Sequence, residues 1–195
     1  MKKSRKLSNK KPLFNVIIIY GTVAVGKFTV ANELHKLINY KFFHNHHIHD
    51  LARQLFERST LHLHRLFENI HFFVFREIVE AKINVVTTHT YLSNYISKTG
   101  LTCPFHLKKI ESIVKRGSGR ACFVHLVADE KEILKRVLGK SRKNYRKLRD
   151  TKILKEYLDN NDWKTVAPVK NNIQIDNTHL SPKKVAQIIK KHFEL

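Results

Sequence analysis

The 195-residue chain has only two cysteines, Cys103 and Cys122, which stand far apart in the sequence. Two isolated thiols without paired spacing indicate neither a disulfide framework nor a cysteine zinc site, and they fit a reducing compartment. Long hydrophobic runs are also missing, so no stretch of the sequence is expected to cross a membrane. We therefore expect a cytoplasmic protein with no membrane partner. Its hydrophobic content of 42% is that of a globular protein with an ordinary core.

Acidic residues are scarce, since 16 Asp and Glu oppose 37 Lys and Arg for a formal net charge of +21. Residues 1–12 carry basic side chains and no acidic ones, and we expect them to form a basic flexible tail. The tail and the apolar run after it imitate a secretory signal, but the run is short and lacks a small-residue cleavage site. A second basic cluster spans residues 135–155. Such charge raises the possibility of nucleic-acid binding through a basic surface, with a merely solvated face as the alternative.

Internal repeats and low-complexity linkers are absent, which favours a single domain over residues 13–195. Apolar, strand-like runs alternate with helix-like stretches, and this alternation predicts an α/β fold with a parallel sheet. The five expected strands are residues 15–20, 41–43, 83–88, 121–127 and 172–176. Residues 46–82 read as a helical region on the substrate side. Apolar residues that recur there at helical spacing are expected in the core: Leu51, Leu55, Leu63, Leu66, Phe67, Ile70, Phe73, Val74, Ile78 and Val79.

The β-branched run of the first strand leads into a glycine-bracketed loop and then into a helix carrying lysine. This order predicts a phosphate-binding loop, because glycines let backbone N–H groups surround phosphate oxygens and lysine supplies a mobile positive charge. The alternative is a plain glycine turn. We expect the loop to bind a nucleoside triphosphate through Gly21, Thr22, Val23, Ala24, Val25, Gly26, Lys27, Phe28 and Thr29.

One residue of this loop departs from the common pattern. Phe28 directly follows Lys27, where a Ser or Thr hydroxyl normally binds magnesium, and a phenyl ring cannot bind the ion. Thr29 lies about 100° further round the helix, so we expect it to contact a phosphate. Mg²⁺ is then expected to be held by water, by phosphates and by other side chains.

Four stretches of the chain together resemble a family of P-loop kinases of unknown substrate, related to shikimate kinase, chloramphenicol phosphotransferase and nucleotide kinases. They are GTVAVGKFT, KFFHNHHIHDL, SRKNYRKLRDTKILKEYL and IDNTHLSPKKVAQIIKKHF, and the resemblance extends over about residues 14–193. It implies a three-layer αβα P-loop fold, use of ATP with Mg²⁺, and a basic lid over about residues 139–150. Members of this family also tend to carry an apolar residue at the position of Phe28 and a threonine at the position of Thr29, so the resemblance includes this departure from the common pattern.

The resemblance also implies where the phosphoryl acceptor binds. The end of the second strand faces the acceptor in such kinases, which makes His44 and Asn45 substrate contacts and His46 and Asp50 catalytic acid–base groups. A network of polar groups capping the next helix is the alternative. Zinc binding by these histidines is disfavoured, because adjacent side chains of a strand point to opposite faces, and we assign no residue as a metal ligand.

Further contacts are implied at other strand ends. Thr87, Thr88 and His89 end the third strand without the aspartate that positions magnesium in many P-loop ATPases; they either contact the acceptor or cap the next loop. Arg142 is the lid arginine expected to stabilise the transferred phosphoryl group, with Arg136 as a weaker nucleotide contact. Asn177 and Thr178 resemble the turn that borders the adenine.

These features predict an ATP-dependent phosphotransferase that acts on a small-molecule or nucleotide-like hydroxyl acceptor. Two alternatives remain open. The net charge favours a nucleic-acid enzyme such as a polynucleotide 5′-end kinase, and Phe28 with the missing strand aspartate favours a nucleotide-binding module with weak or no transfer activity.

Overall fold

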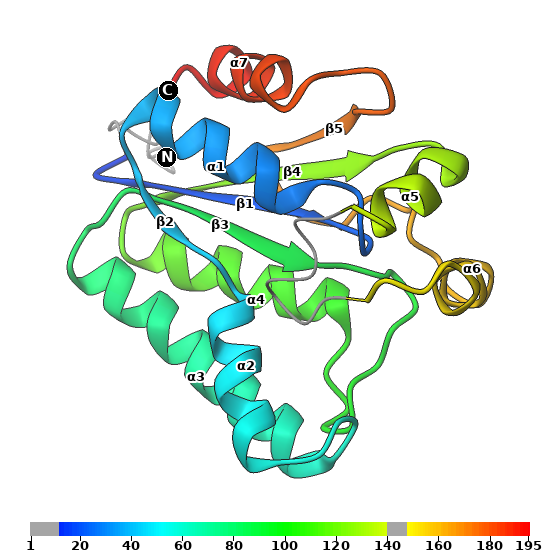
Figure 1. The fold of residues 1–195 in the computed structure, drawn as a ribbon. Helices are drawn as coiled ribbons and strands as arrows, with labels where there is room; N and C mark the ends of the chain where they lie inside the picture. The colour runs from blue at the N-terminus through cyan, green and yellow to red at the C-terminus, as the bar shows by residue number, and fades with distance from the viewer. Residues whose placement is uncertain (1–11, 140–147) are drawn as a thin grey trace, which may run out of the picture.

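A computed structural model describes residues 12–139 and 148–195 of the chain. Within these ranges the chain forms a sheet of five parallel strands in the order β2-β3-β1-β4-β5 (Figure 1). The strands are β1 (Asn15–Gly21), β2 (Lys41–Phe43), β3 (Val85–Thr90), β4 (Arg120–Val127) and β5 (Asn172–Asp176). The predicted five-stranded parallel sheet is therefore confirmed.

Helices cover both faces of this sheet. They are α1 (Lys27–Ile38), α2 (His46–Leu55), α3 (Leu61–Glu80), α4 (Cys103–Arg116), α5 (Glu130–Val137), α6 (Thr151–Asp159) and α7 (Pro182–Phe193). Helices α1 and α7 lie over one face and α3 and α4 over the other, while α5 and α6 lie beyond the carboxyl ends of the strands (Figure 1). No helix in the described part of the chain combines the length and the apolar character that a membrane crossing needs.

Two apolar cores result, one on each face of the sheet. Strand β1 contributes to both, because successive side chains of a strand point to opposite faces. Ile17 and Ile19 pack in the core beneath α1 and α7, whereas Ile18 and Tyr20 pack in the core above α3 and α4. All four are fully buried, so β1 is a central strand that fixes the loop following it on a rigid base.

The helical region between β2 and β3 differs in detail from its prediction. It forms two helices, α2 and α3, and three of its expected core residues are exposed: Leu51 by 46%, Leu55 by 66% and Phe73 by 54%. Helix α2 buries only Ile48 and Ala52, because it packs on one neighbouring helix and not inside the core. The apolar residues at helical spacing therefore predict more buried side chains in α2 than the structure shows.

Strand β3 begins and ends two residues later than its sequence pattern predicts. Lys82 has a left-handed backbone with φ of 53°, and the N–H of Ile83 still donates to the carbonyl oxygen of Ile78. Ile83 therefore belongs to the closing turn of α3. The predicted tail and lid fall largely on residues 1–11 and 140–147, which lie outside the described residues; Asp150, at the end of the predicted lid, caps α6 by accepting from Lys152 and Ile153.

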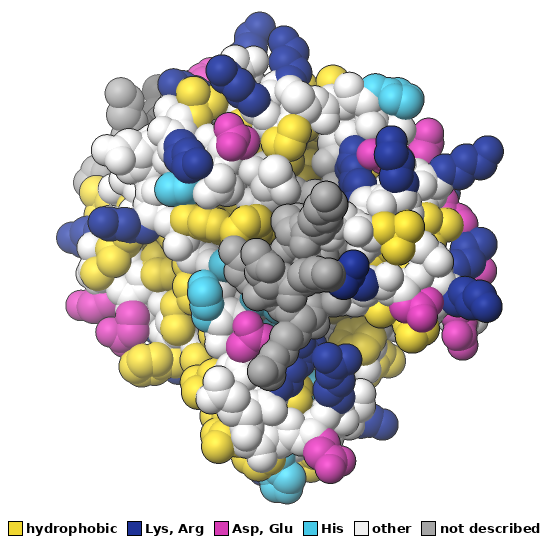
Figure 2. All heavy atoms as spheres, in the orientation of Figure 1, with side chains coloured by type: hydrophobic (Ala, Val, Ile, Leu, Met, Phe, Trp, Pro, Cys, Tyr) yellow, Lys and Arg dark blue, Asp and Glu magenta, His cyan; other side chains and the backbone are white. Residues whose placement is uncertain are grey.

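Charge on the described surface is mixed. In the view of Figure 2, Lys and Arg side chains are spread around the rim with Asp and Glu side chains between them. Lys155, from the predicted basic cluster, pairs with Glu130 and Asp159. Arg136 pairs with Glu132. These ion pairs reduce the net positive charge that this part of the cluster offers to a polyanion.

Candidate active site

The loop between β1 and α1 requires glycine at both of its ends. Gly21 has φ of 144°, and a Cβ there would lie 2.4 Å from the carbonyl oxygen of Leu126. Gly26 has φ of 105° and precedes the first residue of α1. Both backbones are in a region that residues with a Cβ adopt only with strain, so the two glycines of the motif set the shape of the loop.

The backbone N–H groups of this loop are available for an anion. Those of Val23, Ala24, Val25 and Gly26 donate to no atom of the described residues. They lie at the N-terminus of α1, whose dipole favours negative charge. Unpartnered amides next to a helix N-terminus are the arrangement that binds phosphate groups.

Lys27 extends back across the same loop. Its Nζ donates to the carbonyl oxygens of Gly21 at 2.9 Å and Thr22 at 2.6 Å. The ammonium is therefore held over the loop and near its open amides. A terminal phosphate bound by those amides would lie within reach of this charge.

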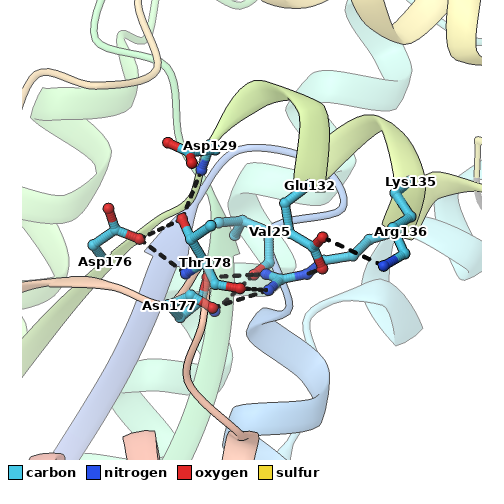
Figure 3. A network of polar contacts seen from close by, with 8 residues as sticks. All are labelled: Val25, Asp129, Glu132, Lys135, Arg136, Asp176, Asn177 and Thr178. Carbon is cyan, nitrogen blue, oxygen red and sulfur yellow. Dashed lines mark hydrogen bonds and ion pairs between the residues drawn. The ribbon is translucent and has the colours of Figure 1, made fainter.

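Helix α5 and the turn at Asn177 and Thr178 hold the phosphate loop in place through hydrogen bonds to Val25, which we call the brace (Figure 3). Arg136 of α5 donates through Nη1 to the carbonyl oxygen of Val25 at 3.1 Å and to Oδ1 of Asn177 at 2.9 Å. Its Nη2 donates to the carbonyl oxygens of Asn177 and Thr178, and its Nε to Glu132. Asn177 Nδ2 donates in turn to Val25 at 2.9 Å. Arg136 thus positions the loop, and a direct nucleotide contact by this residue stays a prediction.

The Asn177–Thr178 turn is itself fixed by Asp176. Thr178 donates to Asp176 Oδ1 from its N–H and from its hydroxyl, and its hydroxyl accepts from the N–H of Asp129. These hydrogen bonds from Thr178 lower the pKa of Asp176. The turn predicted to border the adenine is therefore rigid and joined to the phosphate loop, whereas its contact with adenine is still a prediction.

Phe28 has a packing role in the structure. Its ring lies 5.5 Å from that of Phe42 and 4.8 Å from that of His44, measured between centroids. Thr29 is exposed. In the described part of this site, no hydroxyl follows Lys27 directly and β3 ends without a carboxylate. The loop amides fit a phosphate chain, but these residues supply no side-chain ligand to Mg²⁺ at its usual position.

The carboxyl ends of β2 and β3 lie side by side next to the loop. Phe43 is paired with Thr87 in the sheet, and one residue further His44 Nδ1 lies 2.8 Å from Thr88 Oγ1. Because the His44 ring also packs against Phe28, the predicted acceptor residues of two strands meet beside the residue that follows Lys27. The structure therefore brings His44 and Thr88 together at the edge where the phosphate loop begins.

Helix α2 carries the remaining predicted acceptor groups. Asn45 is its N-cap but makes no capping hydrogen bond with its side chain, and its buried Oδ1 has no partner among the described residues. The helix-cap alternative therefore does not describe Asn45. The His46 ring lies 5.0 Å from that of His44. Asp50 is half-buried, and its charge opposes the lowering of the Arg53 pKa that burial causes.

The side chains at the end of β3 are more deeply buried than those of an open contact surface would be. Thr87 Oγ1 is buried without a partner within residues 12–139 and 148–195, and His89 is 6% exposed. Burial lowers the pKa of His89 well below its usual value, with further lowering from His106, His49 and the charge of Lys27. His89 is paired with Tyr20, the residue before Gly21, so it lies beside the start of the phosphate loop.

Two histidines behind this edge were not identified from the sequence. His71 of α3 and His106 of α4 are buried, and their ring nitrogens Nδ1 and Nε2 lie 2.7 Å apart. Burial lowers the pKa of both well below the usual value. Each lies among apolar residues that recur at helical spacing, and this spacing indicates only that its side chain faces inward. No local motif links two positions that are 35 residues apart.

The strand order, the glycine-bracketed loop and the lysine over it define the fold of a P-loop kinase. No protein-family model matches the chain, and no curated protein matches it in sequence. Solved structures do match over nearly the whole length.

Three such structures are a sugar kinase, a gluconokinase and a shikimate kinase. The sugar kinase from Janibacter sp. HTCC2649 aligns with a TM-score of 0.62 and 13% identity, over 93% of this chain and 95% of its own. The gluconokinase from Sinorhizobium meliloti 1021 aligns with 0.60 and 10%, over 95% and 94%. The shikimate kinase from Acinetobacter baumannii, in complex with shikimate, aligns with 0.54 and 18%, over 93% and 94%. At these identities the likeness establishes the fold.

Proposed function

We propose that the protein is a phosphotransferase that moves the γ-phosphoryl group of ATP to a hydroxyl of a small molecule. The observation that carries the proposal is the row of amides from Val23 to Gly26, which have no acceptor within residues 12–139 and 148–195, with the Lys27 ammonium held beside them. The fold shared with kinases supports a nucleotide ligand. Three neighbours are named as kinases of sugars, gluconate or shikimate, which supports a small acceptor with hydroxyl groups.

The chain's own residues divide the work of transfer between two sides. On the nucleotide side, the loop amides bind phosphate oxygens and Lys27 exchanges its two carbonyl partners for the terminal phosphates, where it offsets charge in the transition state. Arg136 and Asn177 hold Val25, so the amides do not reorganise on binding. On the acceptor side, His44 and Thr88 orient the hydroxyl, and His46 or Asp50 removes its proton.

Magnesium fits this site only as part of the nucleotide. When bound, Mg²⁺ supplies charge neutralisation between phosphate oxygens. Because Phe28 packs against Phe42 and His44 and carries no hydroxyl, Mg²⁺ would be held by phosphate oxygens, water and other side chains. The protein then recognises the phosphates chiefly through amides and Lys27. Arg142, outside the described residues, is proposed to cover the transferred group.

The test is an acceptor screen that measures ADP release from ATP with sugars, nucleosides, shikimate-like alcohols, aminoglycosides and 5′-hydroxyl oligonucleotides. We expect one small acceptor to stimulate release and Lys27→Ala to abolish it. Lys36→Ala is the matched control, because Lys36 is exposed on the same helix. Equal activity of Lys27→Ala and the parent protein would refute the proposal.

The screen also separates the two alternatives. If nucleotide binds with no stimulation by any acceptor, the chain is a nucleotide-binding module. If a 5′-hydroxyl oligonucleotide is the best acceptor, with affinity that falls by ~10³ or more between 50 and 200 mM salt, the nucleic-acid enzyme is the correct class.

A further inference from the structure

Three buried histidines meet on the α3–α4 side of the sheet, behind the acceptor edge. His71 comes from the middle of α3, His89 from the end of β3 and His106 from the first turns of α4. One ring nitrogen of each can be chosen so that all three lie within 4.8 Å of one another. Their exposed fractions are 1%, 6% and 4%. The histidine triad, as we name these three residues, is assembled from parts of the chain that no single sequence pattern connects.

The hydrogen bonds of the triad are incomplete. His71 and His106 share one contact of 2.7 Å, but His71 Nε2 and His89 Nδ1 have no partner among the described residues. Leaving a buried polar atom unpaired costs about 1–3 kcal/mol. If the three histidines only satisfied one another's hydrogen bonds, these two nitrogens would be paired. Because both lack a partner within the described residues, they point to a ligand that the triad binds.

The surroundings of the triad favour a ligand that binds neutral imidazole. The rings of Phe72 and Phe75 lie 4.6 Å from His106 and 5.0 Å from His71, respectively. This apolar wall keeps the imidazoles neutral, and a neutral imidazole offers a lone pair. Nearby carboxylates, which hard cations prefer, are not part of the cluster. Neutral nitrogen donors suit zinc and neighbouring first-row metals, and they do not suit magnesium.

We propose that His71, His89 and His106 bind a divalent first-row transition metal of the zinc class. Zinc–nitrogen bonds of about 2.0–2.1 Å place tetrahedral ligand atoms about 3.4 Å apart. The contact of 2.7 Å between His71 and His106 must therefore open by less than about 1 Å, and any pair near the 4.8 Å limit must close, for one ion to bind all three. The proton shared by His71 and His106 moves to an outer ring nitrogen, so that each ring presents one lone pair.

This site is distinct from the nucleotide site and does not depend on the proposed transfer. A set of three histidines leaves the fourth position of a tetrahedral ion open, as in catalytic zinc sites. His49, packed on Phe67 with ring centroids 3.9 Å apart, lies on the same side and further lowers the pKa of all three triad histidines.

The proposal is tested by metal binding, without nucleotide or acceptor. The full chain, purified without a polyhistidine tag and stripped with a chelator, is titrated with Co²⁺ and Zn²⁺. We expect one Co²⁺ per chain with visible absorption bands of a tetrahedral nitrogen site, displacement of Co²⁺ by Zn²⁺, and no competition from Mg²⁺. His71→Gln, His89→Gln and His106→Gln should each weaken binding by at least ~100-fold, since loss of a supporting group alone costs 10–100-fold.

His47→Gln is the matched control, because His47 is exposed and lies in the histidine-rich segment of the sequence. It should retain full metal binding. Thermal unfolding of the parent protein gives a second readout that needs no variant: zinc should raise Tm, and Mg²⁺ should not reproduce the shift. The proposal is overturned if the parent protein binds no Co²⁺ or Zn²⁺, or if the three triad variants keep the metal as tightly as His47→Gln does.

Discussion

The guanidinium of Arg136 donates to the main-chain carbonyl oxygen of Val25 at 3.1 Å, so helix α5 holds the middle of the phosphate loop. The same carbonyl accepts from the side chain of Asn177 at 2.9 Å. Two side chains from distant elements thus converge on one peptide group. The same loop carries the amides that would bind phosphate. We therefore expect nucleotide affinity to fall when the hydrogen bonds from Arg136 and Asn177 to Val25 are removed.

Arg136→Ala should weaken nucleotide binding by about tenfold or more and lower the free energy of unfolding by about 1–3 kcal/mol, because it removes the charged donors to the carbonyl oxygens of Val25, Asn177 and Thr178. Lys135→Ala is the control, since the side chain of Lys135 is 81% exposed. Isothermal titration calorimetry and denaturant unfolding measure the two effects. Equal affinities for the two variants would show that the brace does not shape the loop.

Phe28→Ser should lower the Mg²⁺ concentration needed for half-maximal nucleotide binding, because it restores a hydroxyl at the usual ligand position. It should also destabilise the protein, since the ring packs on Phe42 and His44. Phe28→Leu separates these effects by keeping an apolar side chain without adding a hydroxyl. A Mg²⁺ dependence that is the same in Phe28→Ser and Phe28→Leu would contradict the assignment of this position.

His46→Gln and Asp50→Asn should each lower kcat by ~10²-fold or more while ATP affinity stays nearly unchanged, if the group acts as the general base. Steady-state kinetics with the acceptor found by the screen measures the loss. Arg53→Gln serves as a control because it removes the neighbour of Asp50 and leaves the carboxylate in place. A loss confined to ATP affinity would remove both residues from the acceptor side.

His125→Phe should make the protein less sensitive to acid. His125 is fully buried and stacks on Tyr20, and burial lowers its pKa to about 4. The unfolded chain, with a histidine pKa near 6.5, binds the proton more readily, so stability is full above pH 6.5 and is lost as pH falls towards 4. This histidine alone contributes about 1.4 kcal/mol of that loss per pH unit.

Unfolding in urea at several pH values between 7 and 4 measures this slope. His125→Phe keeps the ring stack and removes the titrating group, so its slope should be smaller by about one proton. His179→Gln, at an exposed position, should leave the slope unchanged. A slope in His125→Phe equal to that of the parent protein would show that His125 does not titrate on unfolding.

The local parts of the site could be predicted from sequence because they are contiguous. The β-branched run before Gly21 and the helical period after Lys27 fix a strand, a turn and a helix within about 25 residues. Likewise, the polar residues after Phe43 and Val86 mark the ends of two strands, and parallel pairing places such ends at one edge. These features predicted the five-stranded sheet and marked His44 and Thr88 separately as candidate acceptor contacts; that the two side chains meet was found in the structure.

The parts that could not be predicted depend on contacts between distant positions. Arg136 reads as one more basic residue of a charged cluster, and only the fold shows that its donors are directed to Val25 and Asn177. His71 and His106 follow the apolar period of their helices, so the period reports burial and gives no sign that the rings meet. Leu51 and Leu55 show the converse, since a correct helical period does not show which face finds a partner.

The brace on the phosphate loop also constrains the order in which the protein matures. The hydrogen bond from Asn177 to Val25 joins residues 152 positions apart. A ribosome produces the glycine-bracketed loop early and its brace near the end of synthesis, and closing so large a loop is entropically costly until the sheet between them has formed. We therefore expect the proposed nucleotide site to be completed late in folding. A nascent chain would carry the glycine-bracketed motif before it could bind the proposed nucleotide.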